Sequence, residues 1–192
     1  MDDRRAFLLR VSSAVPAVTL MRAAHLSAQP VPAEQPPASD YPLDWESRIA
    51  SDREPGEPMT FSGMVCGPDG KTPAIGVVIY AYHTDVKGLY RPDGSPGLPR
   101  LRGWARTNHE GRYEFRSIRP APYPGGGIAA HVHLSAGGAG YAWKWLDTLE
   151  FAGDPYLREP DIERARTRGR FSWIRSLVKE GGVWQTRHDI RL

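Results

Sequence analysis

Short apolar runs, each closed by a turn rich in Gly or Pro, follow one another from residue 60 to the end of the chain. The runs favour β-branched and aromatic residues, which are typical of strands. They occupy residues 60–67, 75–84, 102–108, 112–118, 127–136, 141–151 and 173–192. Only residues 159–168 have a helical pattern, and Gly181-Gly182 divides the last run as a hairpin turn would. The pattern therefore predicts an all-β chain, an antiparallel β-sandwich with long loops and little helix.

Length and composition fit one ordinary domain. The chain has 192 residues, of which 40% are apolar and 24% charged, and a chain of this size can bury a core without disulfides. Its one cysteine, Cys66, excludes an intramolecular disulfide and a Cys-based zinc site, so we expect Cys66 to be a small core residue. Neither a GxGxxG motif nor a phosphate-binding loop is present, which excludes a nucleotide-binding α/β protein.

The first 28 residues have the features of an export signal. The pair Arg4-Arg5 precedes a moderately apolar stretch that ends in a Leu-Ser-Ala run, as at a cleavage site. This resembles a twin-arginine signal, so we expect residues 1–28 to direct export, most simply to the periplasm. The alternative is an amphipathic or disordered arm on a cytoplasmic protein. Pro16 and Arg22 interrupt the apolar part, so a stable membrane span is not expected.

Residues 29–55 begin with a Pro-rich stretch and show no apolar periodicity, which predicts an extended tether ahead of a folded domain at 56–192. The formal charge is +3, and four of the 25 basic residues lie in the first 28 positions. The rest of the chain is nearly neutral and contains no block of Lys and Arg. Nucleic acid is therefore excluded as an expected partner.

Two histidines, His131 and His133, lie in the strand-like run AAHVHLS. Alternate residues of a strand point to the same face, so both imidazoles enter one space and can reach one metal at about 2.0–2.1 Å. On its own, such a pair also fits two polar surface residues.

Two tyrosines stand in constrained loops near these histidines. Tyr123 lies between Pro122 and Pro124, which restrict its backbone, and three glycines then allow a turn into the histidine run. Tyr90 follows a glycine in the turn after an apolar strand. Taken singly, each tyrosine also fits an ordinary half-buried aromatic residue.

Several blocks between residues 56 and 192 resemble the intradiol ring-cleavage dioxygenase family, especially its protocatechuate-type branch. In order, these blocks are GEPMTFSGMV, GKTPAIGVVIYAYHTDVKGLY, RGWARTNHEGRYEFRSIRPAPYP, HVH, FAGDP and HDIRL. The resemblance implies the transthyretin-like β-sandwich of that family and places non-haem Fe(III) on Tyr90, Tyr123, His131 and His133. Phenolate is a hard anionic donor, so two phenolates suit Fe(III) better than Fe(II).

The resemblance also implies a reaction. A catechol-type ring would be cleaved by O2 between its two hydroxylated carbons to give a muconate-type product. Tyr123 would be the catalytic phenolate that leaves the metal and takes a substrate proton. The expected partners are thus a small aromatic substrate and O2, and subunits of this branch associate as homo- or hetero-oligomers.

The chain departs from the family pattern at two positions. Ile128 stands where the family usually has Arg, and Thr148 stands where it often has Gln. Another cation could substitute for the missing Arg, and Arg91, Arg102 and Lys144 are close in sequence to elements of the site. These departures keep open a second hypothesis, a non-catalytic exported module that binds a metal or a catechol-type ligand.

Two further interpretations remain open. A purely structural transthyretin-like sandwich would need none of the four donor residues. His83 and Asp85, which precede Tyr90, are interpreted either as support for the metal ligands or as exposed polar residues.

Overall fold

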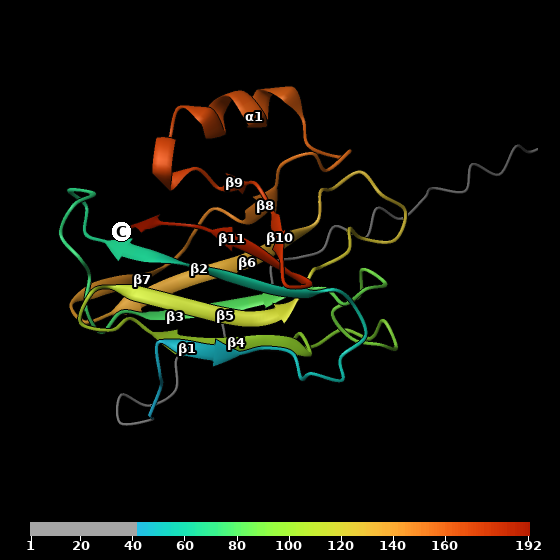
Figure 1. Cartoon of the computed structure of the whole chain (residues 1–192), viewed down its shortest axis with the longest axis horizontal. Coiled ribbons are helices and arrows are strands. Elements are labelled where there is room, and N and C mark those ends of the chain that lie inside the picture. The colour runs from blue at the N-terminus through green and yellow to red at the C-terminus, as the bar shows by residue number, and fades with distance from the viewer. Residues whose placement is uncertain (1–41) are drawn as a thin grey trace, which may run out of the picture. The chain divides into compact units, whose positions relative to one another are not determined.

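The structure, a computed structural model, describes residues 42–192, and within them two six-stranded sheets form a β-sandwich (Figure 1). The strands of the first sheet are β1 (Glu46–Arg48), β2 (Pro58–Cys66), β5 (Arg112–Ile118), β10 (Val178–Glu180), β11 (Val183–Arg187) and β12 (Ile190–Arg191). The strands of the second are β3 (Val78–His83), β4 (Leu101–Arg106), β6 (His131–Gly138), β7 (Tyr141–Trp145), β8 (Leu149–Phe151) and β9 (Ile174–Arg175). The first sheet has the order β1-β5-β2-β11-β10 with β12 beside β2, and the second has the order β4-β3-β6-β8-β9 with β7 beside β6.

One core fills the space between the sheets. Alternate residues of β2 are buried, and the ring of Phe61 stacks on that of Phe115 at 5.1 Å. From the second sheet, Ile79 and Leu134 pack into the same cluster. The strand β3 is buried along its whole length, on both faces. Its outward-facing side chains are therefore covered as well, which places a second buried layer on the outer face of this sheet.

The sheets are mixed rather than purely antiparallel. The pairs β1–β5, β2–β11, β2–β12 and β8–β9 are parallel. An apolar pattern with a period of two gives the face of each residue but not the direction of its neighbour strand. The predicted sandwich is thus confirmed, and most strand pairs of the described chain are antiparallel while these four are parallel.

The predicted helix and terminal hairpin are both confirmed. The helix α1 (Glu159–Arg166) connects the two short strands β8 and β9 through the 3-10 turn η1 (Gly169–Phe171) (Figure 1). The strands β10 and β11 are antiparallel neighbours joined at Gly181-Gly182, where both residues have positive φ angles of 56° and 85°. Such φ angles are those of a tight hairpin turn, and glycine adopts them without strain.

The folded domain begins earlier than the sequence predicted. Part of the expected tether, residues 46–48, is strand β1 and pairs with β5, and Ala50 is buried. The segment has too few apolar residues to show periodicity, and its place is set by strand pairing. The expected export signal at 1–28 and the first part of the tether lie outside the described residues. No helix within residues 42–192 is long and apolar enough to cross a membrane.

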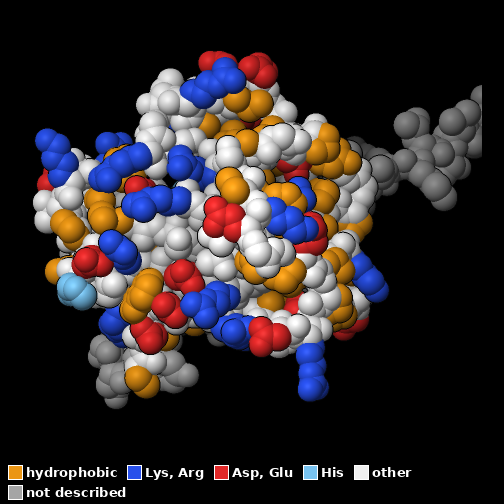
Figure 2. Space-filling view, viewed as in Figure 1, with side chains coloured by type: hydrophobic (Ala, Val, Ile, Leu, Met, Phe, Trp, Pro, Cys, Tyr) orange, Lys and Arg blue, Asp and Glu red, His pale blue; other side chains and the backbone are white. Residues whose placement is uncertain are grey.

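Two features of the composition are visible in the folded chain. Cys66 is fully buried, as predicted, and its thiol is free. Basic and acidic side chains are mixed over much of the face in Figure 2, with apolar groups between them. This mixture agrees with the nearly neutral charge of the domain.

Two buried histidines predict a loss of stability in acid. Burial lowers the pKa of His83 to about 4, and burial together with the Arg175 charge lowers that of His188 to about 4. Both rings are neutral in the folded state, whereas they bind protons at pH 6.5 and below when unfolded. Their stabilising contribution is therefore complete above pH 6.5 and is lost as the pH falls from 6.5 to 4.

We expect the free energy of unfolding to fall steeply across this range, by roughly 3 kcal/mol for each of these histidines. The measurement is urea denaturation at several pH values between 7 and 4.5. Because other groups also titrate, the informative quantity is the difference between the wild type and His83→Gln, which keeps a polar side chain near Ser117. Equal pH dependence of the two proteins would contradict the prediction.

Candidate metal centre

Four side chains meet on the outer face of the second sheet. His131 and His133 project from β6, Tyr90 comes from the loop after β3, and Tyr123 comes from the loop between β5 and β6. The Tyr90 hydroxyl lies 2.8 Å from Nε2 of His133, and the Tyr123 hydroxyl lies 3.1 Å from Nε2 of His131. The two Nε2 atoms are 3.0 Å apart, and the two hydroxyls are in contact. The structure thus brings together all four residues that the sequence singled out.

The spacing of these atoms fits a single metal ion. Two donors bound at right angles at about 2.0–2.1 Å lie about 2.9 Å apart, which is close to the observed separations. Nδ1 of His131 lies 2.7 Å from the carbonyl of Ala129, so its proton resides there and the Nε2 lone pair faces the cluster. Two phenol oxygens and two imidazole nitrogens are a donor set that suits Fe(III). No group of three His, Cys, Asp or Glu in residues 42–192 offers a metal site without tyrosine.

Burial favours the uncharged form of all four donor side chains. Burial lowers the pKa of both histidines, and that of His133 falls to about 3 because His131 adds to the effect. Burial also raises the pKa of Tyr123 and of Tyr90, and for Tyr90 the neighbouring Tyr123 raises it further. The imidazoles are thus neutral and ready to bind, whereas the phenols keep their protons until a cation displaces them.

The two tyrosine loops are tied to each other just behind the donor atoms. The carboxylate of Asp85 accepts hydrogen bonds from the backbone N–H of Lys87 at 2.8 Å and of Leu89 at 3.1 Å, which closes the turn before Tyr90. The hydroxyl of Thr84 donates to the carbonyl of Ala121 at 2.6 Å, in the loop that leads to Tyr123. Asp85, 6% exposed, is therefore a supporting residue and not an exposed one.

A glycine allows the two loops to approach this closely. Gly88 has φ 77°, and a Cβ added there would lie 2.1 Å from the carbonyl oxygen of Pro122. No side chain fits at that distance, and the positive φ disfavours other residues. The position of Tyr123 thus depends on backbone contacts with the loop of Tyr90.

Two other contacts hold the histidine strand in place. The carboxylate of Asp154, in the FAGDP block, accepts from the N–H of Ala130 at 3.0 Å and from that of Tyr156 at 2.9 Å. The ring of Tyr82, directly opposite His133 in the β3–β6 register, stacks on His133 at 4.6 Å. The sequence did not single out Tyr82, although strand pairing at a one-to-one register would have placed it there.

Removal of the Asp85 carboxylate is expected to disturb both phenols. In Asp85→Ala, the N–H groups of Lys87 and Leu89 lose their acceptor, so the turn before Tyr90 loosens. Because supporting contacts of this kind typically contribute about 10–100-fold to metal affinity, we expect a loss of that size, measured by chelator competition. A matched control is Asp93→Ala, since Asp93 closes a similar but exposed turn on Ser95. Equal iron affinity in the two variants would show that Asp85 does not position the ligands.

The cations named from the sequence do not line the hollow that Ile128 borders. A cavity of ≈ 310 Å³ next to the histidine strand is bordered by Ile128, Ala129 and Arg158, among others. The side chains of Arg91 and Arg102 instead bond to Ser95 and to the carbonyl of Pro99. The sequence did not single out Arg158, because it lies in a polar stretch ahead of α1 that has no distinctive motif. Its guanidinium pairs with Asp161 at 2.7 Å.

Thr148 and Lys144 complete the set of positions named from the sequence. Thr148 precedes β8 and borders one hollow together with Glu150, which lies directly opposite His131 in the β6–β8 register. Lys144 is exposed on β7. Thr148 therefore reaches the neighbourhood of the cluster through Glu150.

Fold and site together define a β-sandwich protein with two phenols and two imidazoles gathered as donors on the outer face of one sheet. The chain belongs to the intradiol ring-cleavage dioxygenase family. A family model described as "Dioxygenase" matches residues 40–191, and solved structures of intradiol enzymes share the fold.

The sequence relatives are dioxygenases of catechol-type compounds. The chain is 37% identical over 152 residues to chlorocatechol 1,2-dioxygenase of Rhodococcus opacus, a match that covers 69% of this chain and 58% of that protein. It is 29% identical over 152 residues to the protocatechuate 3,4-dioxygenase beta chain of Burkholderia cepacia, covering 68% and 64% respectively. The matched region thus spans less than two thirds of either relative.

Among solved structures, the dioxygenase domain of a carbohydrate-binding fusion protein from Streptomyces sp. SirexAA-E has a TM-score of 0.59 at 26% identity. The match covers 80% of this chain and 94% of that one. Catechol 1,2-dioxygenase from Pseudomonas arvilla C-1 has a TM-score of 0.60 at 23% identity, covering 79% and 58%. At 23% identity, this similarity shows that the two proteins share a fold.

Proposed function

We propose that this protein is a non-haem Fe(III) dioxygenase that opens a catechol-type ring between its two hydroxylated carbons. The observation that carries the proposal is the cluster of two phenol oxygens and two imidazole nitrogens within bonding range of one ion. Family membership supports it, because the relatives are named as catechol and protocatechuate dioxygenases. Both atoms of O2 enter the product, so that a catechol becomes a muconate-type diacid with no other reactant.

The four donors have separate tasks in this reaction. A ferric ion held by them would acidify the hydroxyls of a bound catechol. The two histidines and Tyr90 keep the donor set in place. Tyr123 would be the donor that gives up its place to the substrate, and it would accept one hydroxyl proton at its Oη atom. Since burial raises the pKa of Tyr123, its phenol keeps that proton once it is free of the cation.

The surroundings of the cluster close one side of His133. Tyr82, 1% exposed, stacks on His133 from the neighbouring strand β3. A cavity beside the histidine strand is bordered by Ile128 and Ala129 and also by charged side chains, among them Arg158. A ring bound next to that strand would therefore meet both apolar and charged groups.

A second candidate is a binding module that holds the catechol without cleaving it. The observation in its favour is Ile128, which offers no positive charge to a ring that gains negative charge as oxygen adds. Oxygen uptake separates the two functions. The iron-loaded protein is mixed with a panel of catechols, and consumption of one O2 per ring with a diacid product supports the enzyme. A stable coloured complex with no uptake supports the module.

We further propose that the protein is exported to the periplasm by the twin-arginine route. The Arg4-Arg5 pair and the apolar stretch after it support this. Replacing both arginines by lysine should retain the protein in the cytoplasm, as measured by cell fractionation. Unchanged distribution would contradict the export route.

A further inference from the structure

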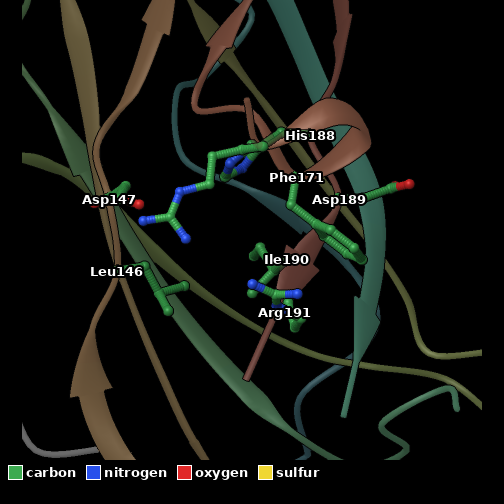
Figure 3. A pocket seen from close by; sticks show the side chains of 8 residues that line it. Leu146, Asp147, Phe171, His188, Asp189, Ile190 and Arg191 are labelled. Carbon is green, nitrogen blue, oxygen red and sulfur yellow. The ribbon is translucent and has the colours of Figure 1, made fainter. Parts of the chain in front are cut away.

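A small pocket outside the metal centre is bordered by two arginines that come from distant parts of the chain. Arg168 follows α1, and Arg191 lies on β12. Together with Phe171 and His188, they line a cavity of ≈ 90 Å³, shown in Figure 3. A cavity of this size has room for a few water molecules or for one small polyatomic ion.

Neither of these two guanidinium groups is neutralised within residues 42–192. No carboxylate of the described chain forms an ion pair or a hydrogen bond with Arg168 or Arg191. The neighbouring arginines differ, since Arg187 lies 3.1 Å and Arg170 3.8 Å from the carboxylate of Asp189. Arg168 and Arg191 are thus positive charges without a countercharge at the same cavity.

The surrounding structure restrains the side chain of Arg191 and the backbone of Arg168. The guanidinium of Arg191 lies 5.5 Å from the centre of the Phe171 ring, a cation–π contact that restricts its motion. The backbone of Arg168 is fixed on both sides, because its N–H donates to Ala165 at 3.0 Å and its carbonyl accepts from Phe171 at 3.1 Å. Such preorganisation reduces the entropy lost when a ligand binds.

The balance of charge at the pocket favours an anion. Two carboxylates also border it, those of Asp147 and Asp189. Asp189, 5% exposed, is already engaged by the N–H of Met64 at 3.0 Å and by its two arginines. His188 is 4% exposed, and burial keeps its ring neutral. Two free positive charges therefore face one free negative charge.

We propose that this pocket, the Arg168–Arg191 pocket, binds a small oxyanion, a phosphate or a carboxylate group, between the two guanidinium groups. The planar N–H fork of arginine matches the paired oxygens of either group. An adjoining hollow shares both arginines and is bordered by Trp173. A carboxylate carried on an aromatic ring could place its ring there, whereas inorganic phosphate would use the small cavity alone.

The test is calorimetric titration of the full, iron-loaded protein with sodium phosphate and, separately, with sodium benzoate at low ionic strength. Loss of a charge-assisted pair typically weakens binding by about tenfold or more, so Arg168→Gln and Arg191→Gln should each show a loss of that size. Arg168→Lys keeps the charge without the fork and should bind with intermediate affinity. Tighter binding of benzoate than of phosphate would identify an aromatic acid as the ligand class.

Two further variants make the result specific. Arg166→Gln removes a positive charge two residues from Arg168 but not from the pocket, and it should leave binding within about twofold of the wild type. Asp147→Asn removes the opposing charge and should tighten binding severalfold. The visible spectrum is recorded in the same titrations, since an anion that binds the iron would shift it. Absence of binding, or binding insensitive to both arginines, would overturn the proposal.

Discussion

Replacing Tyr90 with Phe is expected to remove the visible absorption of the iron-loaded protein or to shift it strongly, and to abolish ring cleavage. The Tyr90 hydroxyl lies 2.8 Å from His133 and in contact with the Tyr123 hydroxyl, so its oxygen is one of four donors. Deletion of one of the two anionic donors leaves a site with less preference for Fe(III). We expect iron affinity to fall by a factor on the order of a hundred or more, measured by chelator competition.

The matched control is Tyr141→Phe, which also deletes one hydroxyl but lies on β7, outside the cluster. It should keep the wild-type spectrum and affinity. The pair Tyr90→Phe and Tyr123→Phe tests the assignment of both phenols. If both variants retain the wild-type colour, the donor assignment is wrong.

Introducing a positive charge beside the histidine strand should raise the rate of ring cleavage. Ile128 is 49% exposed and borders a cavity beside the histidine strand, so an arginine there can extend without displacing the core. A preorganised positive group that stabilises developing charge contributes about a hundredfold or more to turnover. We therefore expect Ile128→Arg to increase kcat for a simple catechol by about that factor, followed by oxygen uptake.

Ile75→Arg is the matched control, because Ile75 is an equally exposed isoleucine at 56% and does not border the cavity. It should leave kcat unchanged. A folded, iron-loaded Ile128→Arg protein with wild-type turnover would mean that the natural substrate supplies its own countercharge or that the site only binds it. The oxygen-uptake assay of the wild type separates these two cases.

The histidine pair of the donor cluster could be predicted because alternate residues of a strand point to the same face. Two histidines separated by one residue in a strand must share a face, and both His131 and His133 lie in β6. The approach of Tyr90 and Tyr123 was different, since each loop alone fits many conformations. Only the resemblance to the family placed the phenols beside the histidines, and the physical cause, the contact of Gly88 with Pro122, involves residues 34 positions apart.

Other features depended on tertiary contacts that no local pattern contains. The strand β1 exists because β5 offers it a free edge, and its own residues are mostly polar. The parallel pairing of β8 with β9 follows from the path of the chain through α1, which connects these two strands. Likewise, the arginine that shares a cavity with Ile128 could not be identified by sequence distance, because Arg158 lies 30 positions away.

The contact between Gly88 and Pro122 has a consequence for protein engineering. Since the backbone of one loop lies where a side chain of the other would be, the two segments cannot be exchanged one at a time with those of a relative. A chimaera that takes residues 84–90 from a relative but keeps residues 119–124 of this chain would combine two loops whose backbones do not fit each other. Directed evolution of ring selectivity should therefore recombine these segments as a single cassette, and libraries that vary only one of them should yield mostly iron-free protein.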